Sequence, residues 1–106
     1  MKQGFEAYHW NDEKDNPEGG VSIGKGFTIS WQRGPLGREK DRILPNGAFA
    51  EDVIEAVADR IRYYQSGKFA CHHNAIALSY LESAMAALKE RTENREKRGV
   101  EGTHEV

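Results

Sequence analysis

The sequence predicts an α+β protein in which an N-terminal β-ribbon precedes an antiparallel two-helix hairpin, assembled as a homo-oligomer. Three observations lead to this prediction. Apolar and polar residues alternate over 27–32, which is the period of a strand with one buried face. Apolar residues recur every three or four positions over 48–65 and again over 77–88, as in amphipathic helices. The short connection 66–68 forces the second helix back against the first.

The length and composition are those of one small domain with a lean core. The chain has 106 residues, of which 38% are hydrophobic and 30% are charged. We expect a single domain over 1–106, with ribbon and loops at about 4–45, the hairpin at about 48–98 and a tail at 99–106. A chain this short has little core of its own, so assembly with further copies is a plausible source of burial.

Charge and hydropathy limit the classes of partner. The formal net charge of −2 does not favour long nucleic acid, whereas a small anionic ligand in a local arginine site is compatible with it. No stretch reaches the ~18 consecutive apolar residues of a membrane span, so we expect no membrane partner. The single cysteine, Cys71, excludes an internal disulfide and suits a reducing cytosol. We therefore expect a cytoplasmic protein.

The N-terminal half predicts the ribbon. Residues 4–10 form a weak strand, and 13–20 are a polar loop punctuated by proline and glycine. The best strand is 27–32, and 21–26 leads into it. We expect an antiparallel ribbon that includes 4–10. Residues 34–37 then break the strand, and 38–42 form a charged, exposed loop.

The two predicted helices carry more apolar surface than they can bury against each other. The first helix has Asn46 as its expected N-cap. Its expected apolar face consists of Phe49, Val53, Val57, Ile61 and Tyr64. The stripe of the second helix consists of Ala77, Leu78, Leu81, Ala84, Met85 and Leu88. Further apolar residues, including Ile54, Ile76 and several alanines, remain for the ribbon or another subunit to cover.

A row of arginines ends the second helix. Arg91, Arg95 and Arg98 follow one another at spacings of four and three, and no acid within the helix lies three or four residues from Arg91 or Arg95. We therefore expect the guanidiniums of Arg91 and Arg95 to be free for an anionic ligand. Lys89, Glu93 and Lys97, by contrast, alternate in sign and are expected to pair with one another. The alternative for the arginines is a solvated helix end, where cations complement the dipole.

The tail adds ligand-binding groups to this row. Gly99 is the expected C-cap glycine, and Gly102, Thr103 and His104 supply close backbone approach, a hydroxyl and an imidazole. Guanidiniums grip phosphates and stack on bases. Among the aromatic residues, Phe69 and Trp31 are candidates to sandwich a base, although core and interface packing is the more common use of such side chains.

Metal binding and catalysis are disfavoured. Cys71, His72, His73, His9 and His104 carry zinc-type ligands, but neighbouring helical side chains point ~100° apart and no standard ligand spacing is present. A nucleophilic Cys71 would need a third, orienting group that the sequence does not single out. No acid–base pair can be assembled either. We expect no metal, no cofactor and no enzymatic activity.

Residues 26–104 resemble a family of small phage and prophage proteins. The matching runs are Gly26–Gln32, Gly34–Gly37, Asn46–Phe49, Phe69–Cys71, Asn74-Ala75, Leu81-Glu82, Ala84, Leu88, Arg91-Thr92, Arg95-Glu96 and Arg98–Thr103. This family carries the helical-hairpin domain shared by anti-CBASS and anti-Thoeris sponge proteins. The resemblance implies protomers that assemble into oligomers, often hexamers, and hold cyclic nucleotide immune signals between subunits without chemistry.

The resemblance therefore implies sequestration of a cyclic oligonucleotide or cyclic ADP-ribose signal in the host bacterial cytoplasm, and the arginine row is compatible with it. A structural or adaptor phage protein that docks a partner through its helix pair is the alternative. An enzyme acting on nucleotides is a third and weaker one.

Overall fold

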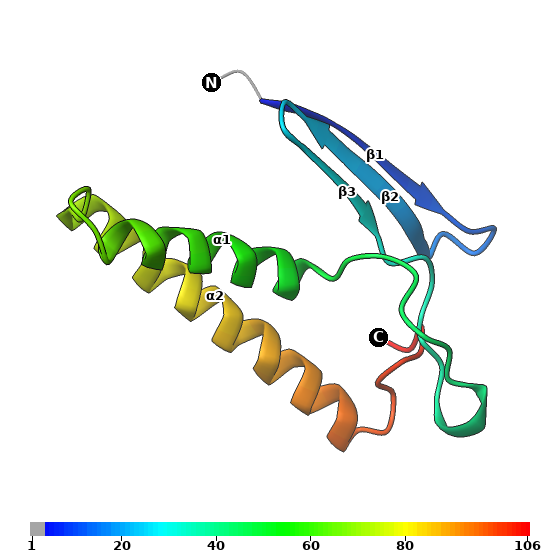
Figure 1. Ribbon diagram of the computed structural model, residues 1–106. Helices are drawn as coiled ribbons and strands as arrows, with labels where there is room; N and C mark the ends of the chain where they lie inside the picture. The colour runs from blue at the N-terminus through cyan, green and yellow to red at the C-terminus, as the bar shows by residue number, and fades with distance from the viewer. Residues whose placement is uncertain (1–3) are drawn as a thin grey trace. The chain divides into compact units, whose positions relative to one another are not determined.

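The computed structural model describes residues 4–106, and the chain falls into two compact units (Figure 1). The sheet unit combines the chain up to Phe49 with the C-terminal segment Gly99–Val106. The helical unit is Ala50–Arg98. Both ends of the helical unit therefore continue into the same sheet unit. The α+β class is confirmed, and each unit is described by itself.

The sheet is a three-stranded antiparallel meander rather than a two-stranded ribbon (Figure 1). Its strands are β1 (Phe5–Asn11), β2 (Pro17–Gly24) and β3 (Phe27–Trp31), in that order across the sheet. The strands expected at 4–10 and 27–32 are confirmed. They do not pair with each other, because β2 lies between them.

The central strand contains residues that were expected to form a loop. Pro17 to Gly20 belong to β2, so the loop prediction over 13–20 was wrong in its second half. Proline and glycine are depleted in strands, which is why composition indicated a loop. Glycine is required at position 20, because a side chain there would collide with the carbonyl oxygen of Tyr8 on β1. The backbones approach closely at this point, and only glycine allows it.

The link between β3 and the first helix is held by side-chain and backbone hydrogen bonds. Ala48 forms a bridge with Trp31, with Ala48 N donating to Ser30 O (2.7 Å) and Gln32 N donating to Ala48 O (2.9 Å). This extended backbone delays the helix to Ala50. Asn46 is therefore not the N-cap that we expected. The loop before it is exposed, as predicted, and contains the 3₁₀ turn η1 (Glu39–Asp41).

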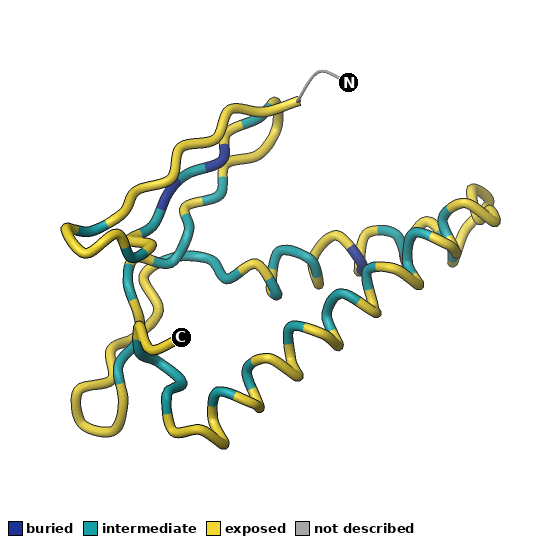
Figure 2. The backbone as a smooth tube through the Cα atoms, turned by 180° about the vertical axis from the view of Figure 1, so that it is seen from behind, coloured by how far each residue is buried: buried dark blue, intermediate teal, exposed yellow. Residues whose placement is uncertain are grey.

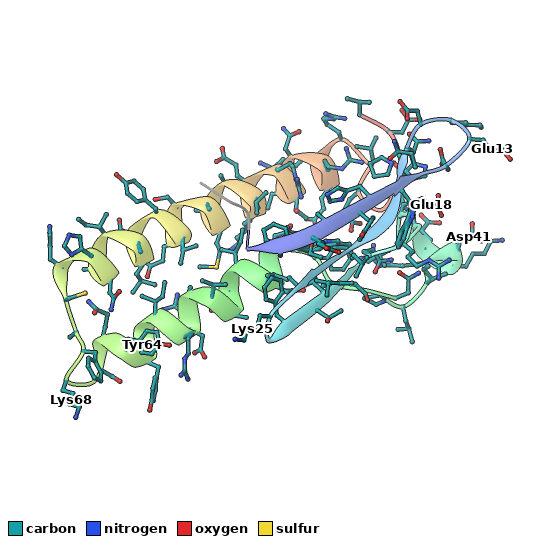
Figure 3. All side chains as sticks on the ribbon, turned by 90° about the horizontal axis from the view of Figure 1, so that it is seen from above. Glu13, Glu18, Lys25, Asp41, Tyr64 and Lys68 are labelled. Carbon is teal, nitrogen blue, oxygen red and sulfur yellow. The ribbon has the colours of Figure 1, made fainter. Side chains whose placement is uncertain are left out.

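The helical unit is the predicted hairpin of α1 (Ala50–Gln65) and α2 (His72–Lys97). The connection is longer than 66–68, because residues 66–71 are outside both helices. Gln65 closes it through two hydrogen bonds to Cys71, one from Cys71 N (2.9 Å) and one to Cys71 O (3.0 Å). Tyr64 and Lys68 lie at this closed end of the hairpin (Figure 3).

The packing stripe of α2 is confirmed, and that of α1 is confirmed at Phe49, Val53 and Ile61 but not at Val57 and Tyr64. The predicted residues of α2, from Ala77 to Leu88, are all half-buried. On α1, Val57 and Tyr64 are 45% and 39% exposed, while Ala58 is fully buried and Ile54 is half-buried. A small alanine lets the two helix backbones come close, so the contact centres on Ala58 rather than on the larger side chains beside it.

Little of the described chain is buried (Figure 2). No residue of α2 is buried, and Ala58 is the only buried hydrophobic residue among those described. Aromatic side chains remain open to solvent in both units, for example Trp10 (53%), Phe69 (71%) and Tyr80 (73%). Within residues 4–106, no helix combines the length and apolar character needed to cross a bilayer.

Candidate functional site

The arginine row lies at the C-terminal end of α2, as predicted, but its first member is not free. Arg91 Nη2 lies 3.6 Å from Glu51 Oε1, at the start of the antiparallel α1. The expectation that Arg91 lacks an acidic partner was therefore wrong, because the partner comes from the other helix rather than from its own. Arg95 and Arg98 also take part in interactions. A ligand at this row would have to compete with them.

The ion pairs predicted for the neighbouring charged face are not observed among the described residues. Lys89, Glu93 and Lys97 form no ion pair with any described residue, although their spacing of four favours pairing. All three are exposed. Solvent screening makes such pairs weak, so their absence is of little energetic consequence. Lys97 is therefore a suitable control position for the arginines.

The end of α2 follows the expected cap. Arg98 is the C-cap, and its backbone N–H donates to Asn94 O at 3.1 Å. Gly99 follows in the left-handed region with φ of 73°. A helix commonly ends with glycine in this conformation, because glycine adopts it without steric cost. The chain then turns away into the tail, which belongs to the sheet unit.

The tail is fastened to the loop around η1 within the sheet unit. Arg42 Nη1 donates to both carboxylate oxygens of Glu101 (2.9 and 3.1 Å), and Arg38 Nη1 donates to Glu101 O (2.8 Å). Gly37 N donates to Gly102 O at 2.8 Å. We call this set of contacts the tail clasp. Glu101 was absent from the predicted site, since its partners lie about sixty positions earlier in the sequence.

The predicted ligand groups of the tail have structural uses in the clasp. A side chain at Gly102 would collide with the carbonyl oxygen of Gly37, and the φ of 80° also favours glycine. Thr103 Oγ1 donates to Val100 O (2.6 Å) and accepts from Glu105 N (3.1 Å). Gly102 therefore makes its close backbone approach to Gly37 of the same chain.

His104 lies in the electrostatic field of the loop between β1 and β2. The backbone N–H of Asn16 donates to Asp12 Oδ1 (2.9 Å), and this bond is the main cause that lowers the pKa of Asp12. The side chain of Asn16, the backbone N–H of Lys14 and the charge of His104 lower the pKa of Asp12 further, while desolvation opposes them. The carboxylate of Asp12 is thus held in its ionised form by a turn of its own loop.

The two aromatic candidates lie far from the arginine row in sequence and, for Phe69, in space. Phe69 precedes the first turn of α2, and Arg95 lies in the last. The helix has 26 residues, so it is about 39 Å long at ~1.5 Å per residue. Within one protomer, Phe69 therefore cannot share a small-ligand site with Arg95. Trp31 belongs to β3 in the sheet unit.

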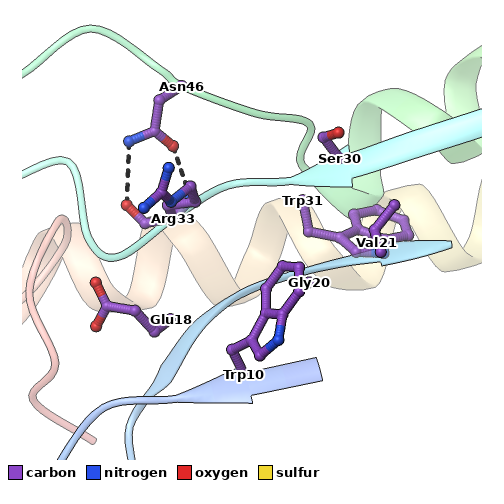
Figure 4. A pocket seen from close by; sticks show the side chains of 8 residues that line it. All are labelled: Trp10, Glu18, Gly20, Val21, Ser30, Trp31, Arg33 and Asn46. Carbon is purple, nitrogen blue, oxygen red and sulfur yellow. Dashed lines mark hydrogen bonds between the residues drawn. The ribbon is translucent and has the colours of Figure 1, made fainter. Parts of the chain in front are cut away.

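Trp31 instead lines a partly open pocket of about 510 Å³ on the sheet unit (Figure 4). The lining residues are Trp10, Glu18, Gly20, Val21, Ser30, Trp31, Arg33 and Asn46. Sequence reasoning missed Glu18 and Arg33, because they lie on different segments and no periodic pattern links them. The fold brings them to one pocket through the β2–β3 pairing.

The cysteine and histidines around 71–73 serve the start of α2. Cys71 is the N-cap, and its sulfur accepts a hydrogen bond from Asn74 N at 3.4 Å. The rings of His72 and His73 diverge, with centroids 6.2 Å apart and planes at 58°. Among residues 4–106, no three His, Cys, Asp or Glu side chains cluster as a metal site would require.

Comparison with known proteins identifies the class. A family model described as "Acb2/Tad1, hairpin domain" matches residues 25–93, which include β3, α1 and most of α2. The chain belongs to this family, and the resemblance seen in the sequence is confirmed. It is also 44% identical over 82 residues to "Thoeris anti-defense 1" of Bacillus phage SBSphiJ7. That alignment covers 77% of this chain and 55% of the relative, so the chain spans about half the relative's length.

Proposed function

We propose that this chain is a non-enzymatic phage immune-evasion protein that binds and sequesters cyclic nucleotide signals, either cyclic di- or trinucleotides or cyclic ADP-ribose types. The observation that carries the proposal is the hairpin-domain match over 25–93, supported by the relative whose name is an anti-defence function. The cationic end of α2 is compatible with it, because guanidiniums bind phosphate in charge-assisted hydrogen bonds.

The proposed site needs more than one subunit. It combines residues of the arginine row, the tail and the aromatic candidates, namely Arg91, Arg95, Arg98, Gly99, Gly102, Thr103, His104, Phe69 and Trp31. Phe69 and Arg95 lie at opposite ends of a helix of about 39 Å, so they can meet at one small ligand only if they come from different protomers. A homo-oligomer such as a hexamer supplies that arrangement.

The thin core supports assembly. No residue of α2 is buried in the single chain, and large apolar side chains remain exposed on both helices, for example Val57 and Ile76. Assembly with further copies would bury these side chains, which the single chain leaves exposed. We expect native mass spectrometry to give a multiple of the 12.0 kDa chain, and a monomer at micromolar concentration would refute the oligomer.

Ligand binding is tested with a panel of cyclic dinucleotides, cyclic trinucleotides and cyclic ADP-ribose isomers. We expect calorimetry to show tight binding of at least one of them, and heating of the complex to release that ligand intact. Hydrolysed product in the eluate would indicate an enzyme instead. No binding across the panel would refute sequestration of these signals.

The arginine row is tested by matched substitutions near the end of α2. Charge-assisted contacts are worth ~1.5–3 kcal/mol, so Arg95→Ala should weaken binding about ten- to a hundredfold. Lys97→Ala removes the same charge from an exposed side chain without an ion pair to a described residue, and it should change little. Equal effects of the two substitutions would show that the row is only a solvated helix end.

A further inference from the structure

The pocket on the sheet unit contains two opposite charges that no described residue neutralises. The guanidinium of Arg33 and the carboxylate of Glu18 both line it, yet neither forms an ion pair or hydrogen bond with another of residues 4–106. They do not pair with each other either. A salt bridge between exposed groups adds little stability, so the two charges stay apart and both are available to a ligand that carries an anion and a donor.

The backbone of Arg33 is fixed from two sides. Asn46 Oδ1 accepts from Arg33 N (2.7 Å), and Asn46 Nδ2 donates to Arg33 O (3.2 Å), as drawn in Figure 4. Gln32 Oε1 in turn accepts from Asn46 N at 2.9 Å. Gly19 leaves room for the aliphatic part of the arginine, because a side chain there would lie 3.0 Å from Arg33 Cγ. Pre-organisation of this kind lowers the ordering cost of binding.

Both tryptophans of the chain line the same pocket. Trp31 is fixed by its Nε1–H, which donates to Oγ of the buried Ser22 at 3.0 Å. The indole of Trp10 makes no hydrogen bond within the described residues, and Trp10 is 53% exposed. The pocket therefore offers an exposed indole and a guanidinium, and nucleic-acid sites combine such aromatic stacking surfaces with positive charge.

We infer that this pocket binds one nucleoside monophosphate unit. The phosphate binds the Arg33 guanidinium, the base stacks on Trp10, and Glu18 accepts an N–H or O–H of the same unit. The volume of about 510 Å³ lies within the ~300–1,000 Å³ of small-molecule sites. This inference rests on the proposed function for its ligand class and adds a subsite built by the sheet unit alone.

The test uses the intrinsic fluorescence of the full-length chain, because both tryptophans report on this pocket. AMP should quench it and bind about tenfold more tightly than adenosine, which lacks the phosphate. Arg33→Ala should lower the affinity for AMP to the affinity for adenosine. Lys25→Ala, which removes a cation from the exposed β2–β3 turn outside the pocket lining, should leave the difference intact. Trp10→Phe should abolish most of the quenching.

The outcomes separate this inference from the proposed function. If AMP and adenosine bind equally, or if Arg33→Ala and Lys25→Ala behave alike, the phosphate subsite is refuted. If a cyclic signal binds by calorimetry but binding is unchanged in Arg33→Ala and fluorescence does not change, the subsite alone is refuted. If AMP quenches as expected and no cyclic signal binds, sequestration is refuted and the subsite remains.

Discussion

The tail clasp leads to a prediction that compares two glycines of one short segment. The two differ in what an added side chain would meet. Gly99 and Gly102 both have left-handed backbones, with φ of 73° and 80°. A side chain at Gly99 would meet nothing within 4 Å, whereas one at Gly102 would collide with the carbonyl oxygen of Gly37. Alanine at either position carries the left-handed cost of ~1–2 kcal/mol. Only alanine at Gly102 must also break the contact with Gly37.

The additional loss can be worked from the clasp. Displacing Gly102 breaks the Gly37 N–H···O bond of 2.8 Å, a net ~0.5–1.5 kcal/mol. The Arg42–Glu101 pair is partly exposed, at 43% and 23%, so it adds at most ~1 kcal/mol. Gly102→Ala should therefore cost about 1–2 kcal/mol more than Gly99→Ala, which is about five- to thirtyfold in the opening equilibrium.

Amide exchange at Gly37 measures this opening directly, because its N–H is bonded to the tail. Exchange should accelerate about tenfold in Gly99→Ala and about a hundredfold or more in Gly102→Ala. The helical unit should keep its exchange rates in Gly102→Ala, and in Gly99→Ala only the last turn of α2, which Gly99 ends, should exchange faster. Equal acceleration in the two variants would refute the close approach at Gly102. Unchanged protection of Gly37 in Gly102→Ala would refute the clasp itself.

Two further predictions follow from charges. The pKa of Asp12 is lowered in the folded chain, so its carboxylate stabilises the fold above the unfolded pKa of ~3.9 and that contribution is lost as the pH falls through the lower folded value. The stability difference between the wild type and Asp12→Ala, measured by thermal melts, should therefore be present at pH 7 and shrink below pH ~4. Glu51 competes with an anion for Arg91, so Glu51→Gln should tighten ligand binding while Arg91→Ala weakens it, measured by calorimetry. Weaker binding in Glu51→Gln would contradict this competition.

Local periodicity predicted those features that depend only on residues close together in the sequence. The stripe of α2 could be read because its positions recur along one face, and the cap at Gly99 because it depends on a single residue. The stripe of α1 was misassigned at Val57, because the neighbouring Ala58 is the residue that is buried. Its burial depends on how closely two helices approach, which hydrophobicity alone does not encode.

The parts that could not be predicted are all contacts between distant segments. The first half of β2 reads as a loop because Gly20 is required by the backbone of β1, which the sequence of β2 does not show. Arg91 reads as unpaired because Glu51 lies forty positions earlier. The pocket around Arg33 and the clasp at Glu101 likewise depend on which loops the sheet brings together. For the proposed site, the sequence indicated which residue types could bind a ligand, but not which residues would lie next to them.

The clasp also bears on how the tail would act in ligand binding. Gly102 and Thr103 already use their backbone freedom and hydroxyl within the sheet unit, so they contact a phosphate only by leaving the clasp or by receiving the ligand where they now lie. In the first case, ligand binding includes the free energy of opening, and Gly102→Ala, which opens the clasp beforehand, tightens binding. In the second case, the same variant removes an ordered wall and weakens binding. The direction of that single change therefore decides whether the tail is a closed part of the fold or a movable part of the site.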